Sequence, residues 1–162
     1  MFNLKINTYF KLIFIISSVS IISAYYIELA LGHQPCNLCL IERIPYGFSI
    51  ILIVINHILK KNEKFFILLL ILVFVFSFMI STYHFGIEQG FFKESAVCGL
   101  KNTPELISKE ELLRQLSEIT VSCKDVTFRI FGLSLTTINI LLSLFLVVIS
   151  IKAFVNYEKF KK

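Results

Sequence analysis

Four long apolar runs constrain this chain more than any other feature, because three are long enough to cross a membrane and the other becomes so when the turn before it is included. The first, Leu12 to Leu31, has 20 residues and one charge, Glu28, near its far end. A helix of that length covers about 30 Å at about 1.5 Å per residue. The run is too long for the apolar region of a cleaved signal peptide, and no small-X-small cleavage site precedes the cysteines that follow it. The other runs are Ile44 to Leu59, Phe65 to Phe85 and Gly132 to Ile151.

These runs, in a chain that is 56% hydrophobic and 17% charged, predict an all-α membrane protein. We expect a single domain over residues 1–162, built as a four-transmembrane-helix bundle. The second run has only 16 residues between Arg43 and Lys60, but counting from Cys36 brings it to 24. The turn that begins at Cys36 is therefore expected at the outer interface of the membrane. Pro45 is then expected in the first turn of this helix, where its missing N–H is no loss.

Basic residues are distributed unequally between the two sides that the spans define. The N-terminal segment, the loop from Lys60 to Lys64 and the tail from Lys152 hold nine lysines and two glutamates, a net charge of +7. The rest of the chain holds seven basic and nine acidic residues, a net of −2, and the whole chain carries +5. The positive-inside rule then places both termini in the cytoplasm and loops 32–43 and 86–131, with all four cysteines, in an oxidising compartment. The basic residues do not line one face, so the charge does not indicate nucleic-acid binding.

Cys36 and Cys39 form a Cys-X-X-Cys pair, the motif with the clearest chemistry. Two thiols three positions apart can close a small, strained disulfide, and a helix that starts at or just after them lowers the pKa of the thiol at its N-terminus. Arg43 lies four residues after Cys39, one helical turn on, where a fixed cation favours the Cys39 thiolate. A thiolate is the species that attacks disulfides and donates electron density to an acceptor. The pair therefore indicates a redox-active site and not a structural staple.

The 46-residue segment 86–131 is much longer than a connection between adjacent helices requires, which indicates a task of its own. Thr103 to Glu105 is typical of a helix N-cap with Pro at the first helical position. The sequence thus predicts a short amphipathic helix, which either lies on the membrane surface or packs on its own loop. Cys98 and Cys123 flank it, and pairing Cys98 with Cys123 and Cys36 with Cys39 keeps each disulfide within its own loop. The apolar stripe of the helix is formed by Leu112, Leu113, Leu116 and Ile119.

Three motifs together resemble the bacterial DsbB family over most of the chain. The first, and the most specific, is the run Gln-Pro-Cys-X-Leu-Cys-X-X-Glu-Arg that ends at Arg43. The second is Tyr83-His84 with Gly86 and Glu88 at the end of the third span. The third is Cys-Lys-X-Val from Cys123, followed by Phe-Gly-Leu-Ser-Leu at the head of the fourth span.

The resemblance implies a specific activity. Members of that family are four-helix enzymes of the bacterial inner membrane that reoxidise the periplasmic thiol oxidase DsbA and pass the electrons to a membrane quinone, here ubiquinone or menaquinone. Carried over by position, Cys36 and Cys39 become the quinone-coupled pair. Cys98 and Cys123 become the pair that meets the partner. Arg43 and His84 become quinone contacts.

Other polar and aromatic positions have less specific interpretations. Family members often carry a Trp shortly before the fourth span, where this chain has Phe128. His57, near the cytoplasmic end of the second span, is expected at the interface or in helix packing and not as a ligand. Glu28 is compatible either with snorkelling to the outer interface or with support for the site.

Three other functions fit part of the pattern. A quinone reductase like the vitamin K epoxide reductases also uses a helical bundle and a thiol relay, but there the Cys-X-X-Cys tends to follow the loop pair and here it precedes it. A zinc site would use the same cysteines, but an oxidising compartment and the lack of a second tight pair argue against it, so no metal is expected. A membrane protein with two structural disulfides gains little from a strained Cys-X-X-Cys ring.

Overall fold

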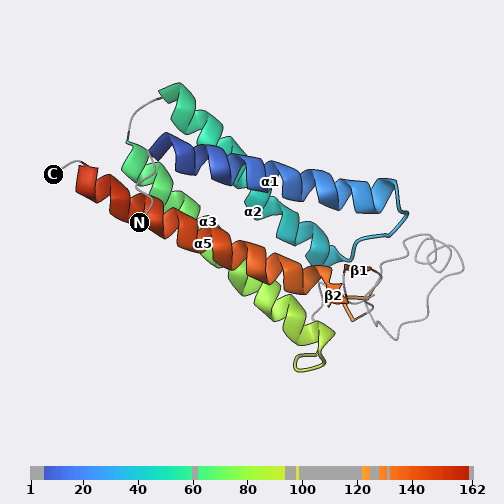
Figure 1. Cartoon of the computed structure of the whole chain (residues 1–162). Helices are drawn as coiled ribbons and strands as arrows, with labels where there is room; N and C mark the ends of the chain where they lie inside the picture. The colour runs from blue at the N-terminus through green and yellow to red at the C-terminus, as the bar shows by residue number, and fades with distance from the viewer. Residues whose placement is uncertain are drawn as a thin grey trace, which may run out of the picture.

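The computed structural model describes residues 6–59, 62–93, 98, 122–124, 128–130 and 132–160. Its main elements are the helices α1 (Ile6–Leu29), α2 (Asn37–Leu59), α3 (Glu63–Glu88) and α5 (Leu135–Phe160), which form one bundle (Figure 1). Each of them is long and apolar enough to cross a membrane. The prediction of a four-helix, multi-pass membrane protein is confirmed. The amphipathic helix expected within loop 86–131 lies outside the described residues.

The helices extend beyond most of the predicted runs. A run of apolar residues ends at the first charge, whereas the helix itself continues through Lys11 in α1 and Lys152 in α5. Long lysine side chains allow this, because their charged ends reach the interface while their stems stay against the helix. Helix α3 likewise begins at Glu63 and ends at Glu88.

Helix α2 begins seven positions before the predicted run, so the expectation for Pro45 was wrong. Pro45 lies inside the helix and is buried. A proline at that position cannot donate to the carbonyl of Ile41, one turn earlier. Neighbouring helices tolerate such a break in a membrane bundle by packing around the freed backbone group. The early start matters because it places Cys39 in the first turn of α2.

A short β-hairpin precedes α5 and corrects the predicted start of the fourth span. Strands β1 (Arg129–Ile130) and β2 (Leu133–Ser134) pair antiparallel, with Arg129 opposite Ser134. Gly132 has a φ of +82°, which suits the tight turn between them. Ser134 then caps α5, since its Oγ accepts the Thr137 N–H at 3.2 Å. Residues 132–134 therefore form the entry to α5 and not its first turn.

The two ends of the bundle have different cores. Figure 1 shows that α1 starts and α5 ends on the same side as the α2–α3 connection, opposite the hairpin. The buried cluster that extends to that side, which we call the apolar end, includes Tyr9, Phe10, Phe66, Ile67, Leu70 and Ala153. The opposite side, which we call the cysteine end, buries Cys36, Leu38, Ile87, Cys98 and Cys123 together. Helices α3 and α5 make the most extensive contact, whereas α1 and α5 touch much less.

Candidate redox site at the cysteine end

Cys36 is the N-cap of α2. Its carbonyl accepts the N–H of Leu40 at 3.2 Å, and its Sγ accepts the N–H of Cys39 at 3.2 Å. This is the arrangement in which a Ser or Asp side chain caps a helix, with sulfur in place of oxygen. Cys36 is buried, Cys39 is half-buried, and both are free thiols. The positive end of the α2 dipole therefore faces the sulfur of Cys36.

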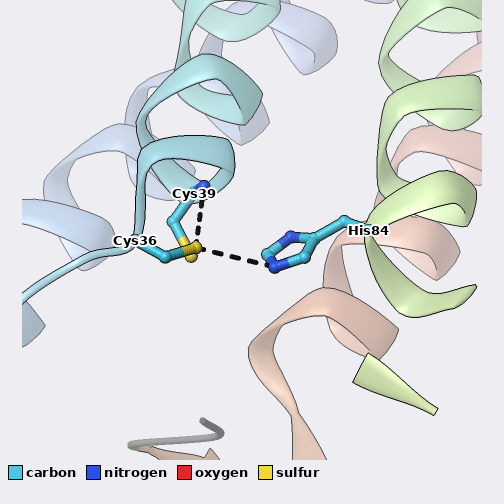
Figure 2. A group of neighbouring side chains, drawn as sticks. All are labelled: Cys36, Cys39 and His84. Carbon is cyan, nitrogen blue, oxygen red and sulfur yellow. Dashed lines mark hydrogen bonds between the residues drawn. The ribbon is translucent and has the colours of Figure 1, made fainter. Parts of the chain in front are cut away.

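His84 approaches the same sulfur from α3. Figure 2 shows its ring pointing across to the Cys-X-X-Cys turn, with Nε2 at 3.6 Å from Cys36 Sγ. Its other ring nitrogen, Nδ1, lies 2.9 Å from Oε1 of Glu42. A carboxylate only accepts hydrogen bonds, so Nδ1 carries a proton and Nε2 is directed at Cys36. His84 and Glu42 are both buried.

These contacts affect the acidity of Cys36. The neighbouring Cys39 thiol lowers the pKa of Cys36 to about 5, burial opposes that shift, and His84 and the Cys39 N–H reinforce it. The sequence assigned the favoured thiolate to Cys39, beside Arg43. The N-cap and His84 instead act on Cys36, so Cys36 carries the stabilised charge in this geometry.

Glu42 links His84 to a polar network that runs into the bundle. Its second oxygen, Oε2, accepts from Asn139 Nδ2 at 2.9 Å, and that nitrogen also donates to Ser81 Oγ at 2.7 Å. Tyr46 donates its hydroxyl hydrogen to Asn139 Oδ1. The sequence reasoning did not single out Glu42, Asn139 or Tyr46. The available signal was an acidic and an amide side chain within apolar spans, which usually mark function.

The second pair of cysteines lies against the first. Cys98 and Cys123 form a disulfide with a Cα–Cα distance of 5.5 Å. Both are buried in the cluster that holds Cys36, with Cys39 and Ile41 packed at its edge. The disulfide thus shares one apolar environment with the free thiols, which is the neighbourhood that thiol–disulfide exchange between two pairs needs.

Arg43 lies at the same end, and its guanidinium contacts α1. Its guanidinium donates to Glu28 Oε2 at 2.5 Å and lies 5.0 Å from the centre of the Tyr25 ring. Of the two interpretations that the sequence left for Glu28, the ion pair favours support for the site. It also fixes the direction of the guanidinium, which the sequence alone could not give.

A cavity of about 580 Å³ brings most of the predicted site residues together. Its polar wall includes Cys36, Cys39, Arg43, His84 and Cys123, and its remaining walls are mostly apolar side chains of α1 and α5. The weak contact between α1 and α5 leaves this space between them. Phe128 also lines it and packs on His33 with ring centres 5.0 Å apart. His57 is exposed in the last turn of α2 and is not part of the lining.

Three of these groups also have the geometry to bind a metal ion. One ligand atom each from Cys36, Cys39 and His84 lie within 4.8 Å of one another. Two sulfurs and an imidazole nitrogen suit a soft ion such as zinc. The same sulfurs can either hold an ion or form a disulfide, so the two uses exclude each other.

Comparison with known proteins agrees with the chemistry of the site. The family model described as "Disulfide bond formation protein DsbB" matches residues 7–153. The uncharacterized protein RP370 of Rickettsia prowazekii (strain Madrid E) is 30% identical over 135 residues, which cover 82% of this chain and 78% of that protein. No solved structure matches the chain. The family match covers all four helices and both pairs of cysteines, so this membrane protein belongs to the DsbB family of disulfide bond formation oxidoreductases.

Proposed function

We propose that this protein is a disulfide:quinone oxidoreductase that reoxidises a periplasmic DsbA-like thiol oxidase. The observation that supports it most is the single cavity shared by Cys36, Cys39, Arg43 and His84, with the Cys98–Cys123 disulfide packed beside them. Free thiols near an apolar space can meet a lipid-soluble acceptor. A disulfide in a long outer segment can meet a soluble protein.

The path of the electrons follows from thiol–disulfide exchange. A thiolate of the partner attacks the Cys98–Cys123 disulfide, and the second partner thiol releases the mixed disulfide, which leaves Cys98 and Cys123 reduced. They in turn reduce a Cys36–Cys39 disulfide by the same two steps. Oxidation of Cys36 and Cys39 then releases two electrons and two protons. A bound quinone supplies the acceptor for both.

The residues of the cavity fit such an acceptor. Its long apolar walls suit a lipid tail, while Arg43 and His84 offer donors at the cysteine end for a ring with carbonyl oxygens. Arg43 is held by Glu28, so its guanidinium is oriented before a ligand arrives. With Nδ1 donating to Glu42, a second proton on Nε2 would lie close to the Cys36 sulfur, and Glu42 would keep the ring in that orientation.

The proposed location is the bacterial inner membrane, as one domain over residues 1–162 with both termini in the cytoplasm. The support is the charge of +7 on one side of the spans against −2 elsewhere. The cysteine end then faces the periplasm. Reporter fusions after Lys61 test the orientation, and activity of a periplasmic reporter at that position would contradict it.

The decisive experiment is an anaerobic assay. Purified protein is mixed with a reduced DsbA-like oxidase and with ubiquinone or menaquinone, and quinone absorbance is followed. For Arg43→Ala we expect the KM for quinone to rise roughly tenfold with little change in the KM for the thiol protein, and Arg43→Lys to lie between. Arg129→Ala is the matched control, because Arg129 is exposed at the same end outside the cavity. Absence of quinone reduction with every thiol donor would reject the proposed function.

The metal geometry defines the second candidate function, a zinc site. It is favoured by the three close ligand atoms of Cys36, Cys39 and His84. Metal analysis of the protein purified under reducing conditions separates the two. One zinc ion per chain, bound to thiols that do not react with quinone, would favour a metal-binding role.

A further inference from the structure

The side chain of Asn139 occupies a position from which it can control the site without touching the sulfur. It belongs to α5, whereas Glu42 and Tyr46 belong to α2 and Ser81 to α3. Asn139 contacts all three of these groups. Its amide is therefore the point where three helices meet just inside the cysteine end.

Every hydrogen-bonding group of that amide is used. Nδ2 donates one hydrogen to Glu42 Oε2 and the other to Ser81 Oγ, while Oδ1 accepts from Tyr46. Ser81 donates its own hydrogen to the carbonyl of Ser77 at 3.0 Å, so it can only accept from Asn139. The partners thus fix which end of the amide is oxygen and which is nitrogen.

This arrangement divides the Glu42 carboxylate between two partners. Oε2 is bound by Asn139 and Oε1 by His84 Nδ1, at 2.9 Å in each case. A carboxylate held at both oxygens cannot rotate, and the ring it binds is held with it. Tyr46 is supported in turn by Ser143, whose Oγ lies 3.2 Å from its hydroxyl.

We propose that Asn139 is a positioning residue for the redox site: it fixes Glu42, and through Glu42 it holds His84 in the orientation in which Nδ1 donates to Glu42 and Nε2 faces Cys36. This inference rests on the proposed redox role of Cys36. The chemistry assigns no proton or electron to Asn139 itself. Tyr46 has the same role but acts less directly, because it binds only the oxygen of the Asn139 amide.

A purely structural role for Asn139 is the alternative, since buried polar side chains also join helices in membranes. The two differ in what a substitution changes. A structural bond affects the stability of the bundle, whereas a positioning bond affects the His84 ring and the reactivity of Cys36. The Asn156–Tyr9 hydrogen bond between α5 and α1, 2.9 Å long, provides a matched interhelical contact at the apolar end, away from the site.

The test uses nitrogen NMR of histidine in the full-length, reduced protein. The chain has three histidines, so ¹⁵N-histidine labelling gives few signals, and His84→Phe assigns the one that matters. We expect wild-type His84 to show a proton held on Nδ1. In Asn139→Leu the Nδ1 proton should exchange rapidly, in Tyr46→Phe it should do so partly, and in Asn156→Leu the signal should be unchanged. His33 and His57 serve as internal references.

A second readout is alkylation of Cys36 at pH 5, followed by peptide mass spectrometry. Asn139→Leu should slow it by roughly fivefold, which corresponds to a loss of thiolate when His84 no longer faces the sulfur. The other titratable and charged groups around Cys36 are the same in this variant. They are Cys39, Glu42, Arg43 with its partner Glu28, His33, His84 and Glu88.

Two outcomes would overturn the proposal. One is an unchanged His84 signal in folded Asn139→Leu. The other is an equal change in Asn156→Leu. If Asn139→Leu does not fold, Asn139→Ala and Tyr46→Phe carry the same comparison. Neither readout needs quinone or a partner protein, so a failure here is distinguishable from a failure of the proposed function.

Discussion

The two ends of the bundle are built from the same four helices but solve different problems. At the apolar end, Phe66, Ile67 and Leu70 of α3 pack among apolar side chains of α1 and α5. At the cysteine end, His84 of the same helix faces a thiol, a carboxylate and an amide. Lipid is as apolar as leucine, so the apolar end is stabilised by close packing and not by exclusion of water. At the cysteine end, a buried polar group is costly unless it has a hydrogen-bond partner, so hydrogen bonds determine how the side chains are arranged there.

The comparison predicts that substitutions at the two ends damage different properties. The largest effect is expected for Cys36→Ser, because a hydroxyl can cap α2 as the sulfur does but cannot form a disulfide. Thiol oxidation should fall at least about a thousandfold while the folded bundle is retained. Oxidation of reduced partner protein and circular dichroism measure the two properties. Substantial remaining activity would show that the reaction does not pass through Cys36.

The opposite pattern is expected for Leu70→Ala at the apolar end. Leu70 is almost fully buried, and its loss should destabilise the bundle by about 2 kcal/mol, the lower end of the usual range because lipid contributes no transfer term. Denaturation in detergent measures this, with Leu72→Ala, which is exposed on the same helix, as the control. Alkylation of Cys36 should be unchanged. A slower alkylation in Leu70→Ala would mean that the two ends are coupled.

His84→Phe should change acidity with little change in stability. Without the imidazole the pKa of Cys36 rises from about 5 towards its usual range. The thiolate is the reactive form and exists above the pKa, so the midpoint of alkylation moves to higher pH. At pH 6 the rate should fall by about tenfold and at pH 9 it should recover. A midpoint that stays in place would assign the low pKa to the N-cap and Cys39 alone.

The smallest effect is expected for Glu28→Gln. Glu28 is not part of the cavity lining, and its ion pair with Arg43 is partly exposed, so its loss should raise the KM for quinone by about threefold at most. Steady-state kinetics with varied quinone measure it. An increase as large as that of Arg43→Ala would mean that the orientation of the guanidinium matters as much as its presence.

The sequence predicted the apolar part of the molecule better than the polar part. Long apolar runs identify membrane helices because the bilayer sets their length. They did not give the start of α2, since a count of apolar residues stops at Arg43 while the cap is made by Cys36. They also placed the start of the fourth span three residues too early, because Gly132 belongs to a turn and α5 begins at Leu135.

The polar network was out of reach for a different reason. The motif contained Glu42, and His84 was named, but nothing in the spacing says that they touch across two helices. Asn139 and Tyr46 meet only because of how α5 and α2 are rotated about their axes, and rotation depends on packing that a single sequence does not encode locally. What the sequence did offer was the presence of a carboxylate and an amide at membrane depth.

The N-cap at Cys36 makes the first turn of α2 depend on whether the cysteine pair is oxidised or reduced. A reduced sulfur accepts the N–H of Cys39, whereas a sulfur bonded to Cys39 loses its negative charge and most of its strength as an acceptor. Each oxidation of the pair should therefore loosen the first turn of α2, and each reduction should tighten it again. Amide hydrogen exchange at Leu38, Cys39 and Leu40 would then follow the redox cycle, faster in the oxidised protein and slower in the reduced one.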